Sequence, residues 1–115
     1  MKNTKNKNEP MTESYFYILL CLEEGANHGY GIMQRALELS DGSVTIGSGT
    51  MYGAISNMLS RGWIEECAEV GVALPRKRQY RLAQEGREAL LSEARRLCHL
   101  AETAQNIINK EEKAQ

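Results

Sequence analysis

Apolar and polar residues recur along this chain with periods that predict four helices and one β-hairpin. Thr12 is a suitable N-cap for a first helix that continues to about Glu24, where Gly25 would end it. Between residues 15 and 22 this helix has almost no polar side, so it must be covered on several faces. A second helix is predicted from about Gly29 to Leu39. Its inner stripe would consist of Tyr30, Met33, Ala36 and Leu37.

A third helix is predicted to begin near Ser48, and its two faces differ in character. The inner stripe has the spacing of a buried face and consists of Met51, Ile55, Met58 and Leu59. The opposite face is small or polar and consists of Gly49, Thr50, Gly53, Ser56 and Asn57. A solvated helix usually carries Glu and Lys there, and a glycine such as Gly53 costs about 1 kcal/mol relative to Ala in mid-helix. We therefore expect this face to press against a large partner.

Two short strands are predicted after the third helix, at residues 64–69 and 76–82, joined by a tip at residues 70–75. The second strand is basic and contains Arg76, Lys77, Arg78 and Arg81. Basic side chains also protect exposed sheet edges, so this strand alone does not indicate a function. Together, the third helix and the basic strand predict a reading helix followed by a basic hairpin. That is the arrangement of a winged helix-turn-helix.

The last segment, residues 83–110, is predicted to form one long helix with a heptad seam. The seam residues, at alternating spacings of four and three, are Leu90, Ala94, Leu97, Ala101, Ala104 and Ile108. No other part of the chain is left to cover this seam, so a second copy is the natural partner. We predict a homodimer built on this helix, with the partner's apolar first helix, including Tyr15 and Leu19, laid against it.

The length of 115 residues is that of one domain. We expect a mostly α fold with a small β-hairpin: a winged helix-turn-helix followed by a long C-terminal dimerisation helix. Residues 1–10 are expected to be a disordered N-terminal segment, 11–82 the winged helix DNA-binding domain, 83–110 the dimerisation helix and 111–115 a frayed tail. The composition, 42% hydrophobic and 25% charged, is ordinary for a globular protein. Because the net charge is −1, DNA binding would have to depend on local positive charge.

The cysteines and the apolar runs indicate where the protein works. Cys21, Cys67 and Cys98 lie far apart and are odd in number, so free thiols in a reducing compartment are expected. The Lys- and Asn-rich N-terminus lacks the apolar core of a signal peptide. The longest apolar run, residues 15–22, is far shorter than the ~20 residues that span a bilayer. We therefore expect a cytoplasmic protein that does not enter membranes.

Candidate catalytic chemistry is sparse. His28 and His99 have no neighbouring nucleophile and no metal-ligand spacing, so neither an enzyme, a metal site nor a cofactor is expected. His28 is expected to close the turn into the second helix.

The third helix offers candidates for DNA contact, each with an ordinary alternative. Ser48 and Thr50 are capping residue types, and they could also hold a backbone phosphate at the helix N-terminus. Tyr52 could belong to the core or reach a phosphate. Asn57 could read a base edge, preferably adenine, or simply be solvated. Trp63 could be a hydrophobic anchor or part of a ligand pocket.

The chain resembles the PadR-like transcriptional regulators, in the short form without a separate C-terminal domain. The resemblance covers about residues 11–108. Its landmarks appear in order: His28-Gly29-Tyr30-Gly31-Ile32, then Gly49-Thr50-Met51-Tyr52 through Leu59, then Gly62-Trp63-Ile64, Tyr80-Arg81-Leu82 and Gly86.

This resemblance implies a dimeric repressor that reads an inverted-repeat operator and is released by a small, often aromatic or cationic, effector. It implies DNA contact at Ser48, Thr50, Tyr52, Asn57, Arg76, Lys77 and Arg78. Two positions depart from the pattern. Ala83 stands where relatives commonly have an N-capping Thr, whose loss costs a helix start about 1 kcal/mol. Leu97 stands where some short members carry a Trp that stacks on flat drugs.

Two other interpretations remain open. A winged helix could serve as a protein-interaction module without a DNA role, as the near-neutral net charge would allow. The dimer could also bind a small ligand with no DNA binding of its own. The sequence does not specify the operator, the effector, the sign of regulation or the regulated genes, nor whether Cys98 has a redox role.

Overall fold

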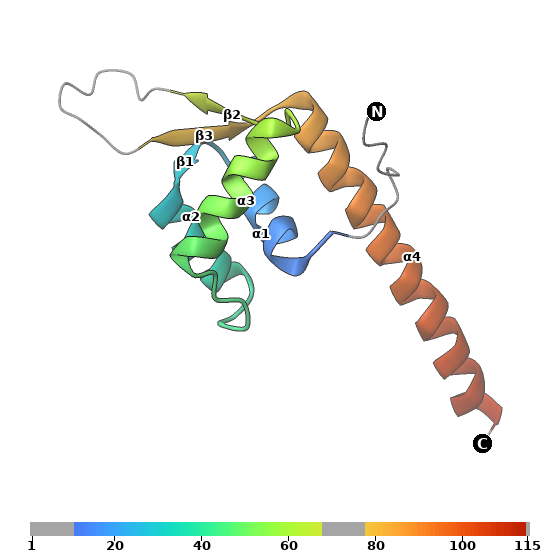
Figure 1. Ribbon diagram of the computed structural model, residues 1–115. Helices are drawn as coiled ribbons and strands as arrows, with labels where there is room; N and C mark the ends of the chain where they lie inside the picture. Colours follow the sequence, from blue (N-terminus) through green and yellow to red (C-terminus); the bar gives the residue numbers. More distant parts are fainter. Residues whose placement is uncertain (1–10, 68–77, 115) are drawn as a thin grey trace.

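The computed structural model describes residues 11–67 and 78–114. These described residues form four helices and a small sheet (Figure 1). In chain order the elements are α1 (Glu13–Glu23), β1 (Asn27–His28), α2 (Gly29–Leu39), α3 (Ser48–Ser60), β2 (Ile64–Cys67), β3 (Gln79–Leu82) and α4 (Gln84–Ala114). The mostly α fold with a small β-hairpin and a long last helix is as predicted.

N-cap side chains stabilise the first turns of α1 and α2. Thr12 is the N-cap of α1, and its hydroxyl accepts a hydrogen bond from the N–H of Tyr15 at 3.1 Å. His28 is the N-cap of α2, and its Nδ1 accepts from the N–H of Gly31 at 3.1 Å. Each bond satisfies one N–H that the helix itself leaves without a partner. Both sequence predictions are confirmed.

The sheet has three antiparallel strands in the order β1-β3-β2. The predicted hairpin strands β2 and β3 pair from Ile64 opposite Leu82 to Cys67 opposite Gln79. β1 was not predicted from the sequence; it places Asn27 opposite Tyr80 on the other side of β3. A strand of two residues is too short to show the alternation by which strands are recognised.

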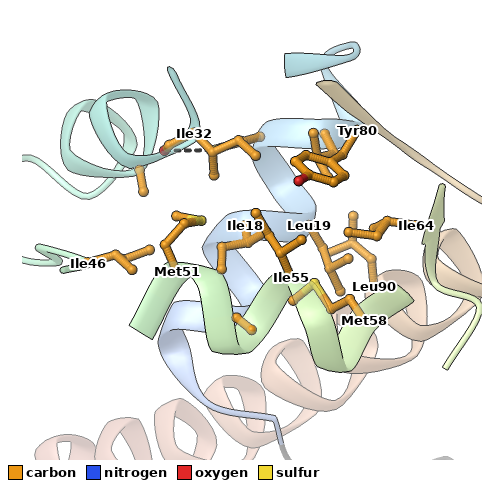
Figure 2. Close-up of a cluster of buried hydrophobic side chains, with 14 of the residues drawn as sticks. Ile18, Leu19, Ile32, Ile46, Met51, Ile55, Met58, Ile64, Tyr80 and Leu90 are labelled. Atoms are coloured by element: carbon orange, nitrogen blue, oxygen red, sulfur yellow. Dashed lines mark hydrogen bonds between the residues drawn. The ribbon is translucent and has the colours of Figure 1, made fainter. Parts of the chain in front are cut away.

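α1 lies at the centre of the core. Ile18 and Leu19 are fully buried. Around them lie residues from every other helix and from the sheet (Figure 2): Ile32, Met51, Ile55, Met58, Ile64, Tyr80 and Leu90. α1 therefore has an apolar surface nearly all round because its own chain covers it on several sides.

The inner faces of α2 and α3 differ in part from the predicted stripes. On α2, Tyr30 is 58% exposed and Leu37 41% exposed, while Ile32 and Ala36 are buried. The helix is thus rotated relative to the predicted stripe, because Ile32 packs into the core between α1 and α3. On α3, Leu59 is exposed and Ala54 is buried in its place.

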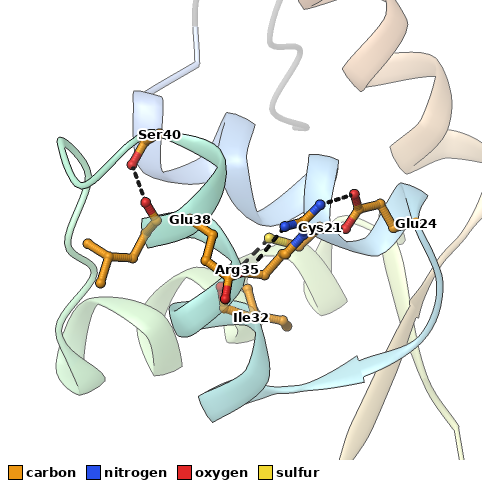
Figure 3. A network of polar contacts seen from close by, with 7 residues as sticks. Cys21, Glu24, Ile32, Arg35, Glu38 and Ser40 are labelled. Carbon is orange, nitrogen blue, oxygen red and sulfur yellow. Dashed lines mark hydrogen bonds and ion pairs between the residues drawn. The ribbon is translucent and has the colours of Figure 1, made fainter.

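Polar contacts fix α2 against α1 (Figure 3). The Arg35 guanidinium donates to both carboxylate oxygens of Glu24 at 2.8 Å, and to Glu38 at 3.0 Å. Close to this pair, the buried Cys21 thiol donates to the Ile32 carbonyl at 3.6 Å. Bidentate Arg–carboxylate geometry adds directional specificity to the packing of the two helices.

α4 begins against the core and then extends away from it (Figure 1). Ala83, which precedes α4, has no side-chain oxygen to cap the helix, but its backbone is anchored: the N–H of Ala83 donates to the Trp63 carbonyl at 2.9 Å, and the Ala83 carbonyl accepts from the N–H of Arg87. Leu90 is buried in the core, whereas every residue from Leu97 to Lys113 is exposed. No helix among the described residues is long and apolar enough to cross a membrane.

Candidate nucleic-acid interface

The outer face of α3 is bare and uncharged. Its exposed residues are Ser48, Gly49, Thr50, Tyr52, Gly53, Ser56 and Asn57. At Gly49 and Gly53, a Cβ would meet nothing within 4 Å, so the space outside the helix is open at both positions. The inner residues Met51, Ile55 and Met58 fix the helix on the core. The outer face of α3 therefore has few protruding side chains, so a large partner can approach the helix backbone closely.

The first turn of α3 has no side-chain cap. Gly47 is the N-cap, and Ser48 lies inside the helix. The N–H groups of the first turn therefore have no side-chain acceptor, and an oxyanion is a suitable partner for them. Ser48 and Thr50 are both exposed beside these groups. Tyr52 is 68% exposed, so it is not a core residue, and its hydroxyl is free to reach a phosphate.

At the other end of α3, Arg61, which was not predicted as a site residue, contacts the predicted contact residue Asn57. The Nε of Arg61 donates to the Oδ1 of Asn57 at 2.8 Å. The guanidinium carbon of Arg61 also lies 4.9 Å from the centroid of the Trp63 ring, a cation–π contact. Trp63 itself is half-buried and packs against the core. The signal for Arg61 was its i, i+4 spacing from Asn57 on one helix side.

The hairpin of β2 and β3 carries paired charges. Arg78, 76% exposed, lies 3.6 Å from Glu66, and Arg81 lies 3.0 Å from Glu65. Arg78 precedes β3, so strand alternation does not fix its direction. The predicted contacts Arg76 and Lys77 lie outside the described residues.

Tyr80 lies in the core beneath this hairpin. Burial raises the pKa of the Tyr80 hydroxyl, and the Glu66 carboxylate raises it further. Tyr80 is a buried, structural part of the hairpin.

α2 exposes two polar side chains, Tyr30 and Gln34, in its first turns. Tyr30 is exposed, and its hydroxyl accepts a hydrogen bond from the Gln34 amide at 3.0 Å. The start of α2 lies close to α3, since a Cβ on Gly29 would be 3.9 Å from the Cγ of Met51. In a helix-turn-helix the first helix crosses the DNA backbone. Tyr30 was not predicted as a contact residue because the sequence pattern placed it on the inner stripe of α2.

The residues predicted for a dimer interface fall into two groups. Leu19 and Leu90 are buried in the core of the single chain, so they have no surface left for a second copy. Tyr15 and Ala94 are half-buried. The remaining four are exposed along α4: Leu97, Ala101, Ala104 and Ile108.

The described residues contain no cluster of three His, Cys, Asp or Glu that could hold a metal ion. His28 is engaged as a helix cap, and His99 is exposed on α4.

Comparison with known proteins adds a family match. Residues 18–92 match the model of the family described as "Transcriptional regulator PadR-like family". No curated protein has a sequence significantly similar to this chain.

Several solved structures share the fold. A transcriptional regulator from Clostridium thermocellum is 26% identical, with a TM-score of 0.63 over 84% of this chain and 87% of its own. A PadR family transcription regulator from Clostridium difficile is 22% identical, with a TM-score of 0.69 over 84% and 99%. Bacillus subtilis PadR, solved in complex with operator DNA, is 22% identical, with a TM-score of 0.61 over 71% and 46%.

Proposed function

Because the chain belongs to the PadR-like family of transcriptional regulators, we propose that it binds an inverted-repeat operator as a homodimer and represses the adjacent genes. The observation that carries this proposal is the bare, uncharged outer face of α3, with an uncapped N-terminus at one end. Members of this family are regulators, which confirms the expectation that the protein is not an enzyme.

In the proposed complex, α3 of each subunit enters a major groove. Ser48, Thr50 and Tyr52 contact phosphates near the start of α3, and Asn57 contacts a base edge. The basic residues Arg76, Lys77 and Arg78 contact the flanking backbone. Support comes from the shared fold of Bacillus subtilis PadR, which was solved with operator DNA.

The proposed dimer uses the exposed apolar side of α4. Leu97, Leu100, Ile107 and Ile108 are 39–54% exposed, an unusual surface for a helix that extends into solvent. A second α4 packed along this side would cover it and would hold two copies of α3 apart for successive half-sites, about 34 Å on B-DNA.

The proposed effector is a small aromatic or cationic compound bound between the subunits of this cytoplasmic protein. Tyr15, Phe16 and Tyr17 of α1 are half-buried and could line such a pocket. Leu97 replaces an aromatic drug-stacking side chain at mid-α4, so stacking at that position is not proposed.

The test is a fluorescence anisotropy titration of the DNA upstream of the protein's own gene, at two salt concentrations and against random competitor DNA. Repressor binding requires tighter binding to the upstream DNA than to the competitor, and a loss of affinity as the salt concentration rises. Binding that ignores both sequence and salt would contradict the proposal. No DNA binding at all would favour the alternative, a protein-interaction or ligand-binding dimer, to which the net charge of −1 and the paired hairpin arginines lend weight.

A further inference from the structure

We propose that Arg61 is a positioning residue that sets the base preference of Asn57. By holding the oxygen of the Asn57 amide, Arg61 leaves the amide N–H groups facing DNA and directs it to guanine rather than adenine. The inference rests on the proposed DNA binding.

The Arg61 guanidinium is held from two directions. Its Nε donates to the Oδ1 of Asn57 at 2.8 Å, one helical turn earlier. Its carbon lies 4.9 Å from the Trp63 ring centroid. Two simultaneous contacts restrict a side chain that would otherwise sample many rotamers.

The Trp63 platform is itself fixed by the backbone. Gly62 turns the chain with φ +76°, a conformation that favours glycine. The N–H of Trp63 then donates to the Met58 carbonyl, and its carbonyl accepts from Ala83, both at 2.9 Å. The end of α3 and the start of α4 therefore fix the backbone of Trp63, whose ring lies against Arg61.

This arrangement changes what Asn57 offers to a base. An unrestrained asparagine reads adenine in the major groove by donating to N7 and accepting from the N6 amino group. Here one lone pair of the amide oxygen already accepts a charge-assisted bond, and the Arg61 cation beside this oxygen disfavours a second donor, such as the adenine N6 amino group, at the other lone pair. The Nδ2 donors remain, and guanine presents two neighbouring acceptors, O6 and N7.

Asn57 also has an unobstructed approach to DNA. One turn earlier, Gly53 has no side chain and open space around its Cβ direction. Asn57 is exposed, and residues 48–60 of α3 include no Asp or Glu that would repel phosphates. A groove edge can therefore come within reach of the amide.

The experiment is selection of binding sites from randomised double-stranded DNA, with sequencing of the bound pool. It uses the full-length protein and the variants N57A, N57D, R61M and R81M. Comparison of the natural protein with N57A identifies the base pair that depends on Asn57. R81M is the matched control, because Arg81 is also an exposed, paired arginine but contacts Glu65 instead.

At that base pair the natural protein is expected to prefer guanine over adenine by at least about fivefold, and R61M should reduce the ratio to within about twofold. R81M should weaken all sites alike and leave the ratio unchanged. N57D keeps an acceptor for Arg61 but loses the donors, so it should abolish the guanine preference and favour cytosine, which donates from N4.

Three results would overturn the inference while leaving DNA binding intact. These are an adenine preference in the natural protein, an R61M ratio equal to that of the natural protein, or an N57A profile that is weaker at every base pair alike, as for a phosphate contact. A natural protein that enriches no sequence would instead refute the proposed function. Thermal unfolding of each variant verifies that a changed profile comes from a folded protein.

Discussion

Two glycines show how the same residue type serves opposite purposes in this fold. Gly86 lies where α4 passes Trp63, and a Cβ there would collide with the Trp63 carbonyl. Gly53 lies in mid-helix with nothing near its Cβ direction. Packing within the chain explains Gly86 but not Gly53, whose cost to α3 is about 1 kcal/mol relative to Ala. The proposed close approach of DNA supplies a reason for Gly53.

The G53A variant should therefore be more stable than the natural protein, by about 0.5–1 kcal/mol in free energy of unfolding. It should also bind operator DNA more weakly, because the added methyl group stands on the docking face. G86A is the matched control and should lose about 1–3 kcal/mol through the backbone collision. Urea unfolding and DNA titration measure both quantities; a G53A variant with full DNA affinity would contradict the docking face.

The Cys21 thiol should be unreactive in the folded protein. It should also make the free energy of unfolding decrease with rising pH in the alkaline range. Burial raises its pKa from 9.0 to about 11, and the Glu24 carboxylate adds to this effect. The folded state favours the protonated thiol. The contribution of Cys21 to the free energy of unfolding is therefore complete below pH 9 and decreases as the pH rises from 9 towards 11.

Urea unfolding at pH 8.5 and pH 10.5 should therefore show a larger loss for the natural protein than for C21A. The exposed Cys98 supplies the control, since C98A should behave as the natural protein does. A thiol reagent at neutral pH should label Cys98 quickly and Cys21 only after unfolding.

At the scale of elements, the sequence predicted helix ends better than helix rotation. Local chemistry sets the ends: Thr12 and His28 cap α1 and α2 as predicted, and α2 begins and ends at the predicted residues. Rotation depends on the rest of the fold, which is why Tyr30 proved exposed and Ile32 buried. β1 escaped prediction because its two residues belong to a strand only through their pairing with β3.

The same limit applies to the candidate site. The bare face of α3 could be predicted from residue size and spacing alone. The hydrogen bond from Arg61 to Asn57 and the ion pairs of Arg78 and Arg81 could not, because side-chain direction decides them.

Two serine or threonine residues at helix starts should respond differently to substitution. T12A should destabilise the protein by about 1 kcal/mol, because the Thr12 hydroxyl caps α1. S48A should change stability by less than about 0.5 kcal/mol, because Ser48 caps nothing in α3. We expect S48A to weaken DNA binding instead. Thermal unfolding and DNA titration separate the two effects, and a destabilised S48A with full affinity would contradict a phosphate contact.

At the scale of the whole molecule, α4 joins two regions with different tasks. The molecule measures 66 × 39 × 24 Å, and the distal half of α4 forms one extremity (Figure 1). The predicted heptad seam begins inside the core at Leu90 and continues on the surface from Leu97 to Ile108. The first part of this seam therefore packs into the core of its own subunit, and the second part is available for contact with a second subunit.

If this surface is the dimer interface, the double variant L97E/A104E should be largely monomeric. A buried, unpaired carboxylate costs well over ~1.4 kcal/mol, which is a tenfold rise in the dissociation constant. N106E is the matched control, because Asn106 lies on the opposite side of the helix. Sedimentation velocity gives the mass, and a double variant that remains dimeric would place the interface elsewhere.

The ion pairs of the β2–β3 hairpin have a consequence for how the protein would find its site. Arg78 and Arg81 each lie within 4 Å of a carboxylate, so the positive charge of each is already partly neutralised before the protein meets DNA. A paired arginine displaces fewer cations from a phosphate backbone, and cation release drives attachment to DNA of arbitrary sequence. Such a protein dwells briefly on each wrong site. Among the ~10⁶–10⁹ competing sites of a genome, short dwell times shorten the search for an operator.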